Sequence, residues 1–135
     1  MNLQEFQDKL DKDVKIDGTK LQWEASNNPV VYAQWLRAYS DVKKQIMLHE
    51  HKKKIALKER LDFYTGRGND ICPDMYEKSE MKTVLAADES ISSIEIKLQM
   101  YQIMLDFCSK ALDIIKARGF SIKNMIEIRT MENGG

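Results

Sequence analysis

The sequence predicts an all-α protein built from long helices. Only 6 of its 135 residues are Gly and 2 are Pro, so long segments contain no helix breaker. Charged residues make up 31% of the chain, above the roughly 25% of average soluble domains. Apolar residues recur every three or four positions, which is the helical period. We expect long helices, the last of them an amphipathic heptad helix that assembles with other copies of the chain.

The N-terminal half is expected to hold three helices. The spacing of Leu3, Phe6, Leu10 and Val14 predicts a helix over residues 2–15. A short helix over 20–26 follows, and Asn27-Asn28-Pro29 indicates a cap and the first turn of a new helix over 29–64. The apolar stripe of that helix fades between Met47 and Ile55, which suggests that this stretch leaves the core of its own subunit.

The C-terminal half follows a breaker at residues 65–70. We expect a helix from Pro73 to about 87, then one from about 88 to 118 that restarts after Gly119 and reaches about 131. Eight positions of this last region form an apolar heptad seam and are the predicted oligomer interface: Ile91, Ile94, Leu98, Tyr101, Leu105, Cys108, Leu112 and Ile115. An alternative stays open, in which the seam packs on the chain's own N-terminal helices.

The neutral total charge hides one basic segment. Residues 30–67 carry nine Lys and Arg against four acids, whereas residues 1–29 and 68–135 are both acidic. The cations that we predict to bind DNA are Lys43, Lys44, Lys52, Lys53, Lys54, Lys58, Arg60 and Arg67. Such a density suits a phosphate backbone, although a solvated helix face would carry similar charges. Phe63 and Tyr64 could stack on bases or anchor the helix end in the core.

The sequence shows no catalytic, metal or cofactor site. His49 and His51 are two residues apart, so on a helix they point in nearly opposite directions and cannot share a zinc ion. Cys72 and Cys108 are too few for a disulfide framework, which favours reduced thiols and a cytoplasmic location. No apolar run is long enough to span a membrane. We therefore expect neither an enzyme nor a membrane protein.

Four blocks of the chain resemble the UvsY family of phage recombination mediators. They are Lys20-Leu21-Gln22-Trp23-Glu24-Ala25-Ser26-Asn27-Asn28, then Leu57-Lys58-Glu59-Arg60-Leu61-Asp62-Phe63-Tyr64-Thr65-Gly66-Arg67-Gly68, then Tyr76-Glu77-Lys78-Ser79-Glu80-Met81-Lys82-Thr83-Val84-Leu85, and then Leu105-Asp106-Phe107-Cys108-Ser109-Lys110-Ala111-Leu112-Asp113 with Arg118-Gly119-Phe120 after it. The likeness covers almost the whole chain.

The resemblance implies a non-enzymatic accessory factor of homologous recombination in an infected bacterial cell. Such a mediator binds single-stranded DNA, helps a RecA-like recombinase displace the single-strand-binding protein, and stabilises the recombinase filament. It implies a closed ring of about six or seven subunits assembled by the C-terminal helix. The Leu-Lys-x-Arg block of the family places the DNA contact at Lys58 and Arg60, with Glu59 in the variable position.

These inferences divide the chain by function into a DNA-binding region, residues 1–68, and an oligomerisation region, residues 69–135. The competing hypothesis is a helical oligomeric adaptor that binds only protein partners, with its basic helix docked on an acidic tail.

Overall fold

The computed structural model describes residues 1–134 and is all-helical within that range. Its four helices are α1 (Leu3–Asp13), α2 (Leu21–Tyr64), α3 (Met81–Ala87) and α4 (Glu89–Glu132). The helices belong to two compact units. Unit 1 comprises residues 1–43 and 103–135, and unit 2 comprises residues 44–102. The predicted functional regions 1–68 and 69–135 divide the chain differently and stay a prediction.

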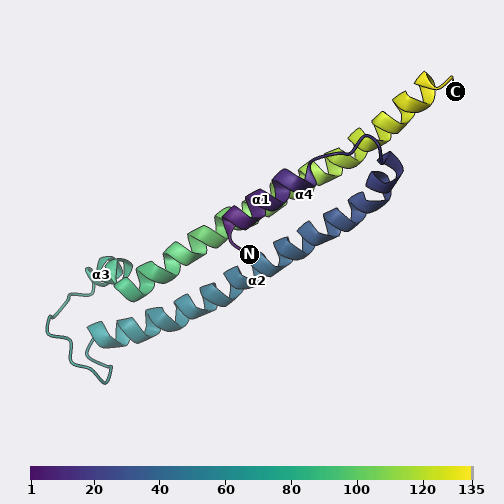
Figure 1. Cartoon of the computed structure of the whole chain (residues 1–135). Coiled ribbons are helices and arrows are strands. Elements are labelled where there is room, and N and C mark those ends of the chain that lie inside the picture. The colour runs from purple at the N-terminus through teal and green to yellow at the C-terminus, as the bar shows by residue number, and fades with distance from the viewer. Residues whose placement is uncertain (135) are drawn as a thin grey trace. The chain divides into compact units, whose positions relative to one another are not determined.

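In unit 1, α1 and the first half of α2 pack with the second half of α4 (Figure 1). Asn2 begins α1, because its side-chain oxygen accepts a hydrogen bond from the Glu5 amide at 2.8 Å. The stripe predicted for this helix is confirmed at Phe6, which is buried against Trp35, although Val14 is exposed. Trp35 also contacts Phe107, so the core of unit 1 draws on all three helices.

A buried polar cluster lies within that core. Arg118 of α4 has its Nη2 atom 3.0 Å from a carboxylate oxygen of Glu24 and donates from Nη1 to Asn28 at 2.8 Å. Nη2 also donates to the Lys15 carbonyl, at 2.6 Å. The Asn28 amide group in turn donates to the Ile115 carbonyl at 2.9 Å. These bonds offset most of the cost of burying the Arg118 charge, and only its Nε atom lacks a partner.

This cluster explains why two predicted helix breaks are wrong. Residues 20–26 and 29–64 were expected to be separate helices, but α2 continues through Pro29. Asn28 does not cap a helix there, because its side chain bonds to α4 instead. Gly119 likewise lies inside α4, where a Cβ atom would come within 2.9 Å of the Asn28 side chain. The glycine therefore permits close helix packing and does not end the helix.

In unit 2, residues from the second half of α2 pack against the first half of α4. The apolar stripe of α2 fades between Met47 and Ile55 as predicted, but the helix does not leave the core of its own subunit there. His49 is buried, with its ring centroid 4.9 Å from that of Tyr101, and Lys53 pairs with Glu95 at 3.1 Å. The helix keeps its inward face, but polar side chains occupy it.

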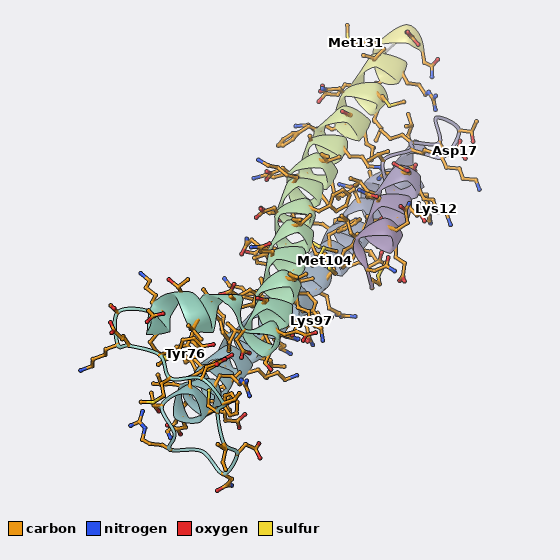
Figure 2. All side chains as sticks on the ribbon, turned by 90° about the vertical axis from the view of Figure 1, so that its left-hand side faces the viewer. Lys12, Asp17, Tyr76, Lys97, Met104 and Met131 are labelled. Atoms are coloured by element: carbon orange, nitrogen blue, oxygen red, sulfur yellow. The ribbon has the colours of Figure 1, made fainter. Side chains whose placement is uncertain are left out.

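The helix predicted from Pro73 to about 87 is much shorter, because α3 begins only at Met81. Met75 is 99% exposed, so the residues before α3 bury little apolar surface that could stabilise a helical turn. Tyr76 is the exception, since its ring packs edge-on against Tyr64 at 5.7 Å and lies beside the end of α2 (Figure 2). No helix within residues 1–134 is long and apolar enough to cross a membrane.

Candidate nucleic-acid interface

Three lysines form an outward cationic face on the unit 2 part of α2. Lys44, Lys54 and Lys58 fall within an arc of about 80° at 100° per residue, with exposed His51 between them. Lys58 is the most accessible of the paired cations, with 79% of its side chain exposed. Lys44 and Lys54 have no ion-pair partner in the described part of the chain. We call Lys44, Lys54 and Lys58 the cationic face.

Exposed apolar side chains lie beside these lysines on α2. Met47, Leu48 and Ile55 are 66%, 56% and 48% exposed. The face therefore offers point charges for phosphates and apolar surface for the flat sides of bases or for a protein partner.

Arg60 points away from the cationic face. Its Nε atom donates to Asp88 at 2.8 Å, and the Tyr64 hydroxyl donates to the same Asp88 oxygen at 2.6 Å. The guanidinium carbon also lies 4.3 Å from the ring centroid of Phe63. The Asp88 side chain is only 4% exposed, so its charge is matched mainly by Arg60. The two cations of the family block thus have different environments: Lys58 faces solvent, and Arg60 holds the end of α2 to the start of α4.

The electrostatics of this triad follow from its hydrogen bonds. Burial alone would raise the pKa of Asp88, but the bonds from Tyr64 and Arg60 outweigh it and lower that pKa. The same bond to Asp88 raises the pKa of the Tyr64 hydroxyl. Phe63 and Tyr64 are half-buried within this arrangement, which favours the interpretation that they anchor the helix end.

The other predicted DNA contacts are spread over several environments. Lys52 is exposed but lies about 120° around the helix from Lys58. Lys53 is half-buried and paired with Glu95. Arg67 is exposed and lies 3.6 Å from Asp62, which also accepts a bond from Lys58. Lys43 belongs to unit 1, where its ammonium lies 5.7 Å from the Tyr39 ring centroid.

A hollow of about 580 Å³ lies beside the end of α2 and adds residues that the sequence analysis missed. Tyr64, Arg67, Tyr76 and Lys78 line it. Tyr76 and Lys78 belong to a block of family resemblance, but neither was given a role, because the segment that carries them has no periodic pattern. Asp88 was missed for a related reason, since a single acid at a helix start looks like an ordinary cap.

The predicted oligomer seam is largely used within the chain. Ile91, Cys108 and Ile115 are at most 1% exposed, so they have no surface left for another copy in this conformation. The remaining five, Ile94, Leu98, Tyr101, Leu105 and Leu112, are half-buried. The three buried residues pack within the chain, as the alternative interpretation expects, and the role of the other five in contact between copies stays a prediction.

Unit 1 exposes a different set of apolar residues on α4. Ile103, Ile114 and Ile128 are 51%, 42% and 54% exposed and lie within an arc of about 40°. We call them the exposed isoleucine stripe. A monomer gains nothing from holding three isoleucines in water, so this stripe is the better candidate for contact between copies.

Comparisons with known proteins give one consistent result. Residues 9–135 match the family described as recombination, repair and ssDNA binding protein UvsY. The recombination protein uvsY of Enterobacteria phage T4 is 52% identical over 136 residues, covering 99% of each chain. Two crystal structures of the bacteriophage T4 recombination mediator protein UvsY superpose with TM-scores of 0.88 and 0.87. They are 50% and 52% identical and cover 98% and 95% of this chain, and 98% of each crystal chain.

Proposed function

Because this chain belongs to the UvsY family of recombination, repair and single-stranded-DNA-binding proteins, we propose that it acts as a recombination mediator. In this role it binds single-stranded DNA, helps a RecA-like recombinase replace the single-strand-binding protein, and stabilises the resulting filament in the cytoplasm of the infected cell. It performs this work by binding, without catalysis.

The observation that supports DNA binding most directly is the cationic face. Lys44, Lys54 and Lys58 share one exposed side of α2, and only Lys58 has an acidic partner among residues 1–134. Each lysine that neutralises a phosphate releases counterions, so a few such contacts give weak and salt-sensitive binding. Arg60 supports the face indirectly, by fixing the end of α2 through Asp88.

Assembly converts weak contacts into firm binding. We infer that copies meet through the exposed isoleucine stripe of α4 and form a ring of about six or seven subunits. A strand bound to one cationic face is then at high effective concentration for the next, which can raise affinity by about 10²-fold or more. In this proposal residues 1–68 provide most DNA contacts and residues 69–135 provide most of the assembly surface.

The mediator step follows from multivalent binding in this proposal. A strand held at several points on one ring is bent, and a bent strand fits the single-strand-binding protein less well. The recombinase then finds a stretch of exposed bases on which to nucleate.

The test is a salt titration of a labelled oligo(dT) with two matched double variants. Lys54→Ala with Lys58→Ala removes two charges of the cationic face, and the log–log salt slope should fall by about 1.4 per subunit. Lys82→Ala with Lys97→Ala removes two exposed lysines of unit 2 from other helices and should leave the slope unchanged. Equal slopes for both variants would exclude the cationic face as the DNA contact.

The same variants test the mediator role. Recombinase assembly on DNA coated with single-strand-binding protein should slow with the cationic-face variant and proceed normally with the control. If the wild type binds an acidic peptide but not oligo(dT), the protein-only adaptor is the correct function.

A further inference from the structure

Unit 1 contains a groove between α2 and α4 that none of the predicted DNA contacts lines. It consists of two adjoining hollows of about 450 and 440 Å³ that share Asn28, Pro29, Gly119 and Lys123. The first hollow is also lined by Tyr32, Lys116 and Phe120. We call this first hollow alone, of about 450 Å³, the Lys116–Lys123 groove.

Gly119 and Asn28 form part of the floor of the groove. A Cβ atom at position 119 would lie 2.9 Å from the Asn28 side chain, so the glycine lets α2 and α4 approach closely beneath the hollow. The polar atoms of Asn28 are already bonded to Ile115 and Arg118. The floor therefore offers little further hydrogen bonding and is suited to a flat, weakly polar group.

Two aromatic rings border this floor. Phe120 is 62% exposed, which is unusual for a phenylalanine on a helix that also has a buried core face. Tyr32 lines the hollow from α2 and is half-buried. An exposed ring at the edge of a hollow can stack on a nucleic-acid base, and such stacking accepts any base.

Two lysines complete the groove. Lys116 and Lys123 are seven residues apart on α4, about 10 Å along the axis, and Phe120 lies between them. Both are exposed, and neither pairs with an acid in the part of the chain that the structure describes. Glu127 lines only the second hollow, so the charge around Lys116 and Phe120 stays positive.

We propose that the Lys116–Lys123 groove is a second contact for single-stranded DNA, with Lys116 and Lys123 on phosphates and Phe120 stacked on a base between them. The inference rests on the proposed binding of single-stranded DNA, but it concerns a different unit and different residues. An acidic peptide would use the lysines equally well. The exposed Phe120 ring favours a nucleic-acid strand, because a base can stack on the ring and a carboxylate side chain cannot.

The test uses the full-length protein and oligo(dT) of graded length. Lys116→Gln with Lys123→Gln should lower affinity for long oligonucleotides and reduce the salt slope by about 1.4 per subunit. Phe120→Ala should weaken binding about tenfold with the slope unchanged, because stacking releases no counterions. The matched control is Lys12→Gln with Lys20→Gln, two exposed unit 1 lysines outside the groove (Lys12 is labelled in Figure 2).

A second readout does not depend on affinity. In the Phe120→Trp variant, addition of oligo(dT) should quench the new indole emission beyond the change seen in the wild type, as stacking requires. If groove variants and control bind alike and the emission of the Phe120→Trp variant is unchanged, while the cationic-face variant still loses DNA, the groove is not a DNA site and the proposed function stands. If the wild type binds no oligonucleotide, both proposals fail. Quenching by poly-glutamate but not by oligo(dT) would make an acidic peptide the occupant and overturn the inference.

Discussion

The two units bury very different amounts of apolar side chain, although α2 and α4 supply most of both. Ten of the eleven buried hydrophobic side chains in residues 1–134 belong to unit 1, and unit 2 contributes only Ile91. Both units also bury polar side chains, which are Glu24, Asn28 and Arg118 in unit 1 and His49 and Asp88 in unit 2. Since apolar burial provides most folding free energy, we infer that unit 1 carries the stability of the fold. Unit 2 buries His49 and Asp88 with almost no apolar core around them.

The buried ion pairs show the same contrast. In unit 1 both Arg118 and Glu24 have only 6% of the side chain exposed, so the pair is sealed from water. In unit 2 Arg60 is 32% exposed while its partner Asp88 is 4% exposed. A sealed pair depends wholly on its partner, whereas a half-open pair can be rescued by solvent. The difference predicts how each unit responds to loss of an arginine.

Arg118→Ala should give the largest effect, a loss of about 3–5 kcal/mol of unfolding free energy. The substitution leaves Glu24 buried, with the Asp17 amide as its remaining hydrogen-bond donor. The measurement is the midpoint of urea unfolding, monitored by circular dichroism. Arg129→Ala, an exposed arginine on the same helix, is the control and should stay within about 0.5 kcal/mol of the wild type.

Arg60→Ala sharpens the comparison and should cost about 1.5–3 kcal/mol in the same experiment. Asp88 keeps the Tyr64 hydroxyl and the Ser90 amide as donors, so its carboxylate stays hydrogen-bonded. An equal loss for Arg60→Ala and Arg118→Ala would contradict the idea that the unit 2 pair is the more replaceable one.

The pKa of Asp88 gives unit 2 a dependence on acid pH. Because that pKa is lowered below its usual 3.8 in the folded protein, the ionised Asp88 contributes stability above this value and loses it as the pH falls through the folded pKa. Asp88→Asn should therefore be less stable than the wild type at neutral pH. The difference in unfolding free energy between the two proteins should become smaller below about pH 4. Urea midpoints of both proteins between pH 3 and 7 provide the measurement. A gap that stays constant would show that the Asp88 charge contributes nothing.

Periodicity predicted the helical class well and the helix boundaries less well. An apolar face of α4 was predicted from spacing alone, because apolar residues at three and four positions must share one face. Spacing could not show which chain covers that face. In unit 1 the side chains of Glu24 and Asn28 bond to Arg118 of α4, which lies 94 and 90 residues further along the sequence.

The candidate site was predicted as a region rather than as a geometry. The basic segment was visible in the charge count, and residues two apart, as Lys58 and Arg60 are, lie about 200° apart on a helix. That Arg60 faces Asp88 could not be predicted, since it depends on the pairing of residues 28 apart. The Lys116–Lys123 groove could not be predicted for a similar reason. Its lysines lie in an acidic half of the chain, and the hollow exists only because α4 packs beside Tyr32 of α2.

The two cysteines provide the finest test, because there is one in each unit. Cys72 in unit 2 is half-exposed, whereas Cys108 in unit 1 is fully buried, and burial raises the pKa of its thiol to about 11. The thiolate is the form that attacks a disulfide reagent, so Cys108 can react only when unit 1 opens. We expect two labelling phases with a disulfide reagent at pH 8, of which Cys72→Ser removes the fast one and Cys108→Ser the slow one.

The arginine variants then assign each phase to its unit. Arg118→Ala should accelerate only the slow phase, because it weakens the core around Cys108. Arg60→Ala should leave the slow phase unchanged if the units open independently. Acceleration of Cys108 labelling by Arg60→Ala would show that the two units unfold together. The free energy of unfolding would then be shared between unit 1 and unit 2.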